Sequence, residues 1–379
     1  MSPMPASAYR PPMRQTHISS PCSEGRSACR KGIHSAPYAP ARRSSDLSRT
    51  VIATTGDLFS DFAPYVASVN DAGIVAFQAT LEDGGTGVFL GSGGPVTQVA
   101  DLASIADIAS HPDLNGAGVI SFYGNLSGGD QGVFLHRDGR LNTVADTRDT
   151  FMSIGPAGPT MNEAGMVAYR ADRLPGVSGI FVWDGASSAT VAETQGRWSQ
   201  FYGLPVINNG GTVVFRADRS DGLQGVYAAA AGSIRTLAET GDRFEALAHF
   251  PSMNDRGSVA FAATLRSGGA GIFTVQDGRT IQVFDTGSAF ESYRGALISA
   301  DDAVIAIATP RGRTMGLYTG SDPETDRILG IGDSLFGSTV TELAANPVSV
   351  SAAGHLAIRV KLVDESQLIL RVDRKPAIR

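Results

Sequence analysis

An Asn-x-x-Gly motif recurs along the chain at a nearly constant interval. Five copies begin at Asn70, Asn115, Asn162, Asn208 and Asn254, and two degraded copies begin at Ser299 and Ser351. Successive copies are 45, 47, 46, 46, 45 and 52 residues apart. A period in this range indicates a repeat architecture, in which each unit needs its neighbours to bury its apolar face. Residues present in every copy serve the structure, so the motif constrains the fold far more than the activity.

Each repeat predicts four short strands. In the first repeat the extended segments are residues 61–70, 74–81, 87–90 and 96–101, and Gly-rich turns separate them. This alternation of strands and turns is typical of an all-β repeat. The predicted fold class is therefore all-β, a seven-bladed β-propeller of four-stranded blades.

The two ends of the repeat array predict a closed ring. A lone strand at residues 51–54 precedes the first repeat, and the last repeat ends without its fourth strand. A propeller closes when such an N-terminal strand completes the C-terminal blade, whereas an open solenoid needs polar capping repeats at both ends. We expect the propeller to span residues 51–375, after a disordered, basic, Ser/Pro/Arg-rich tail at residues 1–50. Aromatic residues that follow the fourth strands are expected to wedge between adjacent blades: Phe151, Trp198, Phe244, Phe290 and Phe336.

Charge and composition exclude several classes of function. Residues 1–50 contain eight of the 31 Lys/Arg and two of the 37 Asp/Glu, so the remainder holds 23 Lys/Arg against 35 Asp/Glu. An acidic body is a poor nucleic-acid binder, because that affinity comes mainly from neutralising phosphates. No apolar run is long enough to predict a membrane span. Both cysteines, Cys22 and Cys29, lie in the tail, and no cofactor or metal site is evident. We expect a monomer.

The motif resembles that of the bacterial NxxGxxAF tandem-repeat proteins. The match is complete at Asn70/Gly73/Ala76/Phe77 and at Asn254/Gly257/Ala260/Phe261. It is relaxed in the copies that begin at Asn115, Asn162 and Asn208, and it is lost in the last two copies. The resemblance covers roughly residues 51–372 and implies a fold without catalytic residues. It also implies an exported or surface protein. The sequence shows neither a signal peptide nor an anchor, so a cytoplasmic location stays open.

A functional residue is expected where the repeats differ. Five positions before each motif residue, the predicted first strand holds Tyr65, Ser110, Ala157, Gly203, His249, Arg294 and Asn346. This position is small in repeats two to four and large and polar in repeats five, six, seven and one, which are consecutive around a ring. We therefore predict that His249, Arg294, Asn346 and Tyr65 converge on the channel mouth, where Arg offers a planar fork to an anion. The alternative is polar filling of a water-lined channel.

Loop residues on the same face are further candidates, because exposed loops on a rigid scaffold are natural contact groups. Arg197, Trp198 and Arg243 are the ligand-binding candidates there. No nucleophile elbow, phosphate-binding loop or metalloprotease motif occurs in the sequence. The sequence favours a non-enzymatic module that binds a small molecule, glycan or protein. The alternative is a lyase, hydrolase or cyclase in which His249 is the acid/base, Arg294 holds an anionic group and Tyr65 orients the substrate.

Overall fold

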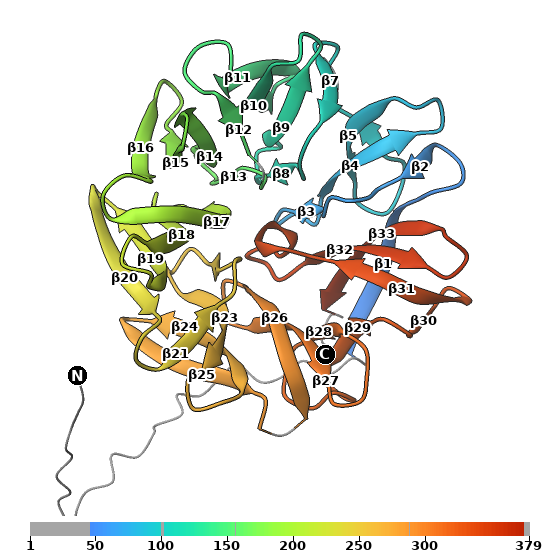
Figure 1. The fold of residues 1–379 in the computed structure, drawn as a ribbon. Coiled ribbons are helices and arrows are strands. Elements are labelled where there is room, and N and C mark those ends of the chain that lie inside the picture. The colour runs from blue at the N-terminus through green and yellow to red at the C-terminus, as the bar shows by residue number, and fades with distance from the viewer. Residues whose placement is uncertain (1–45, 100–101, 156, 288, 375–379) are drawn as a thin grey trace, which may run out of the picture. The chain divides into compact units, whose positions relative to one another are not determined.

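The computed structural model describes residues 46–99, 102–155, 157–287 and 289–374, and these residues form a seven-bladed β-propeller (Figure 1). The predicted fold class is confirmed. The first strand, β1 (Leu47–Thr54), begins four residues before the predicted strand, so the propeller starts inside the segment assigned to the tail. Residues 1–45 of the predicted tail lie outside the described residues, as do residues 375–379.

We number the blades in the order of the repeats, and the first three blades have the following strands. Blade 1 contains β2 (Phe59–Asp61), β3 (Ser68–Val69), β4 (Val75–Leu81), β5 (Thr86–Gly91) and β6 (Thr97–Gln98). Blade 2 contains β7 (Ile105–Ile108), β8 (Asp113–Leu114), β9 (Ile120–Leu126), β10 (Gln131–Arg137) and β11 (Arg140–Asp146). Blade 3 contains β12 (Ser153–Ile154), β13 (Thr160–Met161), β14 (Val167–Leu174), β15 (Val177–Trp183) and β16 (Ser188–Glu193).

The other four blades complete the ring. Blade 4 contains β17 (Trp198–Ile207), β18 (Val213–Arg219), β19 (Gln224–Ala230) and β20 (Ser233–Glu239). Blade 5 contains β21 (Phe244–Leu247), β22 (Ser252–Met253), β23 (Val259–Leu265), β24 (Ala270–Gln276) and β25 (Arg279–Asp285). Blade 6 contains β26 (Phe290–Ile298), β27 (Val304–Pro310), β28 (Gly316–Tyr318) and β29 (Arg327–Gly330). Blade 7 contains β30 (Ser334–Leu335), β31 (Ser338–Ala344), the 3-10 helix η2 (Pro347–Ser349), β32 (Leu356–Leu362), β33 (Gln367–Arg374) and β1.

The N-terminal strand closes the ring, as the sequence predicts. Strand β1 pairs antiparallel with β33, from Leu47 opposite Arg374 to Thr54 opposite Leu368. The side chain of Ile52, in β1, packs in an apolar cluster that contains Ile369 of blade 7 and Phe77 of blade 1. The first and last segments of the repeat array are therefore held by both backbone pairing and apolar burial.

One apolar cluster fills each of the seven spaces between neighbouring blades. Side chains alternate along a strand, so each sheet buries one face against the preceding blade and the other against the following blade. Between blades 4 and 5, for example, Phe244 contacts Phe261 and Phe273 at ring-centroid distances of 5.7 and 4.9 Å, and the group packs on aliphatic residues of blade 4.

The predicted aromatic wedge is present in blades 3 to 6 and absent in blade 7. Phe151, Trp198, Phe244 and Phe290 are buried between blades. The prediction for Phe336 is wrong, because this side chain is 61% exposed and Leu335 occupies the buried position. Phe336 lies in the tight turn between β30 and β31 with a φ of 50°, which directs its side chain away from the core.

The motif asparagines stabilise their own turns and also connect neighbouring blades. The Oδ1 atom of Asn70 accepts hydrogen bonds from the backbone N–H groups of Ala72 and Ile74 at 3.1 and 3.0 Å, which confirms the predicted turn role. Its Nδ2 atom donates to the carbonyl of Asn115 in blade 2 at 3.1 Å. The same link runs from Asn115 to Asn162, Asn208, Asn254 and Ser299. The asparagines thus form a chain of hydrogen bonds around one mouth of the ring.

Candidate functional site

The centre of the ring holds two cavities, one at each end of the inner strands. The segment between β31 and β32, which contains η2, reaches toward the centre of the ring (Figure 1). Its residue Pro347 lines both cavities. The last repeat interval is the longest in the chain, and part of its extra length forms this segment.

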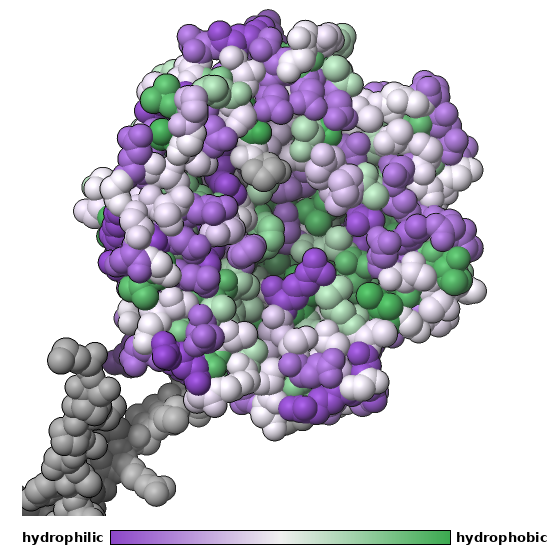
Figure 2. Space-filling view, in the orientation of Figure 1, coloured by the Kyte–Doolittle hydropathy of each residue, from purple (hydrophilic) through white to green (hydrophobic). Residues whose placement is uncertain are grey.

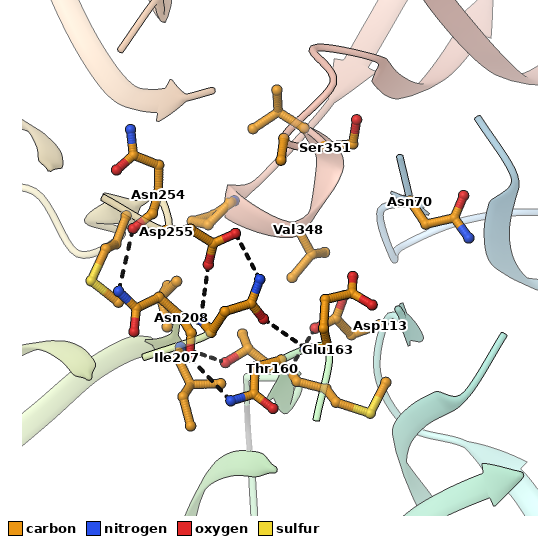
Figure 3. Close-up of a pocket in the computed structure, with 18 of the residues that line it drawn as sticks. Asn70, Asp113, Thr160, Glu163, Ile207, Asn208, Asn254, Asp255, Val348 and Ser351 are labelled. Carbon is orange, nitrogen blue, oxygen red and sulfur yellow. Dashed lines mark hydrogen bonds between the residues drawn. The ribbon is translucent and has the colours of Figure 1, made fainter. Parts of the chain in front are cut away.

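The smaller cavity lies among the Asn-x-x-Gly turns and has a volume of about 150 Å³. Its lining contains the carboxylates of Asp71, Asp113, Glu163 and Asp255 and no Lys or Arg. Figure 3 shows Asp113, Glu163 and Asp255 around the cavity, together with the motif asparagines Asn70, Asn208 and Asn254. We call this end of the channel the acidic mouth.

The carboxylates of the acidic mouth serve the contacts between blades. Glu163 accepts from the N–H of Gly116 at 2.9 Å, and Asp255 accepts from the N–H of Asn209 at 2.8 Å. Asp113 accepts from the N–H of Met161 at 2.7 Å. Burial raises the pKa of Asp113 to about 7, against the opposing effect of its backbone hydrogen bonds. A space this small, bordered by side chains that already have partners, favours a structural role.

The larger cavity, which we call the central cavity, opens at the opposite end of the inner strands. Its volume is about 520 Å³, which lies within the range of small-molecule sites. All seven blades contribute to its lining. Figure 2 shows a hollow at the centre of the ring with an apolar floor and a hydrophilic surround. The polar side chains that line the cavity are Tyr65, Ser110, His111, Arg170, Arg294 and Asn346, and the apolar ones include Leu204, Phe250, Leu297, Met315 and Leu343.

Three of the four predicted channel residues line this cavity, namely Tyr65, Arg294 and Asn346. They lie where the inner strand of a blade departs from regular backbone pairing with the second strand. The inner strand of blade 1 is interrupted between β2 and β3 at Tyr65, and the pairing of β26 shifts register between Tyr293 and Gly295, on either side of Arg294. Such bulges redirect a side chain away from the regular alternation of a strand. The interruption, which the sequence does not display, therefore places this position at the cavity.

The three residues differ in how firmly they are held. Arg294 is exposed, and it forms no ion pair within the described part of the chain. Asn346 caps η2, because its Oδ1 atom accepts from the N–H of Val348 at 3.0 Å, while its Nδ2 atom lies 3.5 Å from Nδ1 of His111. Burial, followed by the charge of Asp107, raises the pKa of Tyr65, so its phenol is neutral and able to donate a hydrogen bond.

His249 does not line the central cavity. Its ring stacks on Tyr202 of blade 4, with a centroid distance of 4.6 Å. Burial and then the nearby Arg216 guanidinium lower the pKa of His249. Gly203 explains the placement, because a Cβ atom there would lie 2.0 Å from the carbonyl oxygen of His249. The missing side chain lets the backbone of blade 5 approach blade 4, and the following residue, Phe250, faces the cavity instead.

The predicted loop residues Arg197, Trp198 and Arg243 also lie away from the central cavity. The Trp198 ring is buried between blades 3 and 4, and the Arg197 guanidinium lies 4.4 Å from its centroid. Arg243 lies over Phe273 at 4.7 Å and donates to Gln282 at 2.8 Å. Both arginines precede the wedge aromatic of their blade, and cation–π contacts of this kind stabilise a fold. Their positions favour packing between blades over ligand binding.

Sequence reasoning missed Arg170 and His111. Arg170 occupies the eighth position after the motif Asn, on the second strand, where the other blades have Gln78, Tyr123, Arg216, Ala262, Ile307 and Arg359. A long polar side chain inside an otherwise apolar strand was the available signal. Arg170 donates from Nη1 to the carbonyl of Gly203 at 3.1 Å, and its buried Nε atom has no hydrogen-bond partner.

His111 is a neutral ring in the wall of the cavity. Burial lowers its pKa to about 4, against the opposing effect of a hydrogen bond with the backbone of Pro159. Its Nε2 atom is buried without a hydrogen-bond partner. The nearest signal in the sequence is that His111 directly follows Ser110, the residue of blade 2 at the position that varies between blades.

Two further observations concern the described residues as a whole. Within the described ranges, no three His, Cys, Asp or Glu side chains gather as a metal-ligand group. No helix in this part of the chain is long and apolar enough to cross a membrane.

Comparison with known proteins supports the fold. No protein-family model matches the chain, and no curated protein matches it in sequence. Among solved structures, the oligogalacturonate lyase of Vibrio parahaemolyticus is similar with a TM-score of 0.53 and 9% identity over 88% of this chain and 98% of that one. An oligogalacturonate lyase in complex with manganese gives 0.55 and 10% over 89% and 99%.

A third similar structure, from a study of two prolyl endopeptidases, gives a TM-score of 0.51 with 12% identity over 88% of this chain and 51% of that one. Identities this low carry the propeller fold and no activity, because one fold hosts many unrelated functions.

Proposed function

We propose that this propeller binds a small organic anion in the central cavity, with the anionic group held by Arg294. The observation that carries the proposal is the charge of the lining. Among the residues that the structure describes, the cavity lining contains two arginines and no Asp or Glu, whereas acidic residues outnumber basic ones by 35 to 23 over residues 51–379. A guanidinium that is free of carboxylate partners is available for a ligand carboxylate or phosphate, which it contacts through paired N–H groups.

The rest of the lining supports a small molecule over a macromolecule. Tyr65 and Asn346 supply hydrogen-bonding groups beside Arg294, and Leu297 and Leu343 supply apolar wall. A concave, mostly apolar site with a few convergent polar groups is typical of ligand pockets. A protein or glycan bound at the loop face would have no need of this enclosed volume.

The placement of His249 favours binding over catalysis. The alternative mechanism needs an acid/base at the reacting atom, and His249 lies outside the cavity lining and is stacked on Tyr202. His111 does line the cavity, and burial keeps it neutral with a pKa of about 4. We therefore propose a binding protein, and turnover of the bound anion is the result that would restore the enzymatic alternative.

We also propose that the chain belongs to the NxxGxxAF repeat proteins. The geometry gives each motif residue a physical role. The side chain of Asn70 connects two blades. Gly73 has a φ of 72°, a backbone conformation that favours glycine. Ala76 and Phe77 are almost fully buried. An alignment in which these four positions co-occur in repeat after repeat of related chains is the test.

Calorimetric titration of hexanoate tests the binding proposal. The Arg294→Met variant is expected to bind hexanoate at least about tenfold more weakly, because a charge-assisted hydrogen-bond pair is lost. Arg235→Met is the matched control, since Arg235 is exposed on the outer strand β20 and the change in net charge is identical. Equal affinity of the wild type and Arg294→Met for hexanoate refutes the proposal. The proposal is also refuted if the wild type binds none of hexanoate, benzoate and phenyl phosphate.

A further inference from the structure

Blades 3 and 4 carry the same Arg-x-Asp sequence on their second strands, yet the two arginines have different surroundings. In blade 4, Arg216 forms an ion pair with Asp218 at 2.5 Å and is 1% exposed. In blade 3, the equivalent Asp172 accepts a hydrogen bond of 2.6 Å from the hydroxyl of Ser153. Arg170 forms no ion pair within the described residues and lines the central cavity.

This difference leaves a cation on the wall of the central cavity. Within the described residues, the side chain of Arg170 donates one hydrogen bond, to the carbonyl of Gly203, and its buried Nε has no partner. Burial lowers the pKa of the Arg170 guanidinium, and the charge of Asp172 is among the effects that oppose this shift. A partly buried cation that has lost part of its hydration is stabilised by an added anion. The guanidinium therefore brings to the cavity wall a positive charge that an anionic ligand group would stabilise.

Arg170 and Arg294 belong to nearly opposite blades. Arg170 is on β14 of blade 3 and Arg294 is on β26 of blade 6, which lie three blades apart in one direction and four in the other. No larger separation exists in a ring of seven blades. The cavity lining also includes the apolar side chains of Leu204, Leu297 and Met315. The hydrogen bond to the carbonyl of Gly203 holds the Arg170 guanidinium beside blade 4, whereas Arg294 is exposed on blade 6, so each arginine offers an anchor of its own.

We infer that the ligand carries two anionic groups, one at each end of a partly apolar body, as an α,ω-dicarboxylate does. The inference rests on the proposed function, since it assigns a second anchor to the same cavity. Arg294, at the exposed rim, holds one carboxylate, and Arg170, in the wall opposite, holds the other. Within this inference Ser153 is a positioning residue, because its hydroxyl donates to Asp172 and so competes with Arg170 for that carboxylate.

Calorimetric titrations of the full chain with straight-chain carboxylates test the inference. Dicarboxylates from succinate to sebacate are compared with monocarboxylates of the same length. We expect the best dicarboxylate to bind at least about tenfold more tightly than its monocarboxylate, since the second charge-assisted contact is worth that factor. We also expect a maximum at one chain length, because the two arginines are fixed on separate blades.

Two substitutions separate the roles of the residues. Arg170→Met is expected to reduce dicarboxylate affinity to that of the monocarboxylate, with monocarboxylate affinity changed less than about threefold. Ser153→Ala is expected to release Asp172 to Arg170 and to give the same selective loss, without removing a charge. Arg235→Met again serves as the control.

Each outcome either supports or refutes the inference. Equal affinity of mono- and dicarboxylates, with both lost in Arg294→Met, overturns the second anchor and leaves the proposed function standing. If neither series binds, and benzoate and phenyl phosphate do not bind either, the proposed function itself is refuted. If Arg170→Met does not fold, the length series on the wild type still decides, since affinity that is independent of chain length contradicts two fixed anchors.

Discussion

The asparagine links between blades lead to a specific prediction for stability. Asn162 is buried, and its side chain makes two hydrogen bonds, accepting from the N–H of Met166 at 2.9 Å and donating to the carbonyl of Asn208 at 3.1 Å. In Asn162→Ala the N–H of Met166 loses its partner. The carbonyl of Asn208 keeps the hydrogen bond from Gly211 at 2.9 Å.

The two losses have different costs. A buried donor without a partner costs about 1–3 kcal/mol, and the loss of a hydrogen bond whose acceptor keeps another partner costs about 1 kcal/mol. We therefore expect Asn162→Ala to lower the free energy of unfolding by about 2–4 kcal/mol. Urea denaturation followed by circular dichroism measures this difference as a lower midpoint.

The control for this measurement is Asn142→Ala. Asn142 is exposed on the outer strand β11 and its side chain makes only a long contact of 3.5 Å with a carbonyl. We expect a change below about 0.5 kcal/mol for this surface position. A loss in Asn162→Ala no larger than in Asn142→Ala would show that the links between blades contribute nothing, and the structural reading of the motif would then be wrong.

Two further predictions concern the acidic mouth and the closure of the ring. The pKa of Asp113 is raised from 3.8 to about 7, so the folded state binds a proton that the unfolded state releases, and stability falls as the pH rises from about 4 to about 7. Asp113→Thr introduces the hydroxyl found at the equivalent Thr160 and should remove up to about 4 kcal/mol of this pH dependence. If the unfolding free energies of the wild type and the variant change with pH in parallel from pH 4 to 8, the prediction is wrong. Removal of residues 1–54 deletes β1 and should abolish cooperative unfolding, whereas removal of residues 1–45 should preserve it. Identical thermal transitions for the two truncated chains would show that β1 does not close the ring.

The sequence by itself determined the repeat, the number of blades and the closure of the ring. These properties follow from local patterns, since the turn chemistry of Asn-x-x-Gly and the alternation of apolar residues are written in every copy. The variation five positions before the motif also singled out Tyr65, Arg294 and Asn346, which line the central cavity, because a residue that differs between repeats is not required by the common fold.

Only the tertiary structure decided which polar residues share a cavity. His249 has the sequence position of a channel residue, but Gly203 in the neighbouring blade brings the backbones together and turns its ring onto Tyr202. Arg170 and Arg216 are alike in sequence, but Asp218 forms an ion pair with Arg216, whereas Asp172 accepts from Ser153, a residue on another strand. A repeat pattern records the environment common to all blades, whereas a binding site depends on contacts between blades, where side chains distant in sequence compete for the same partners.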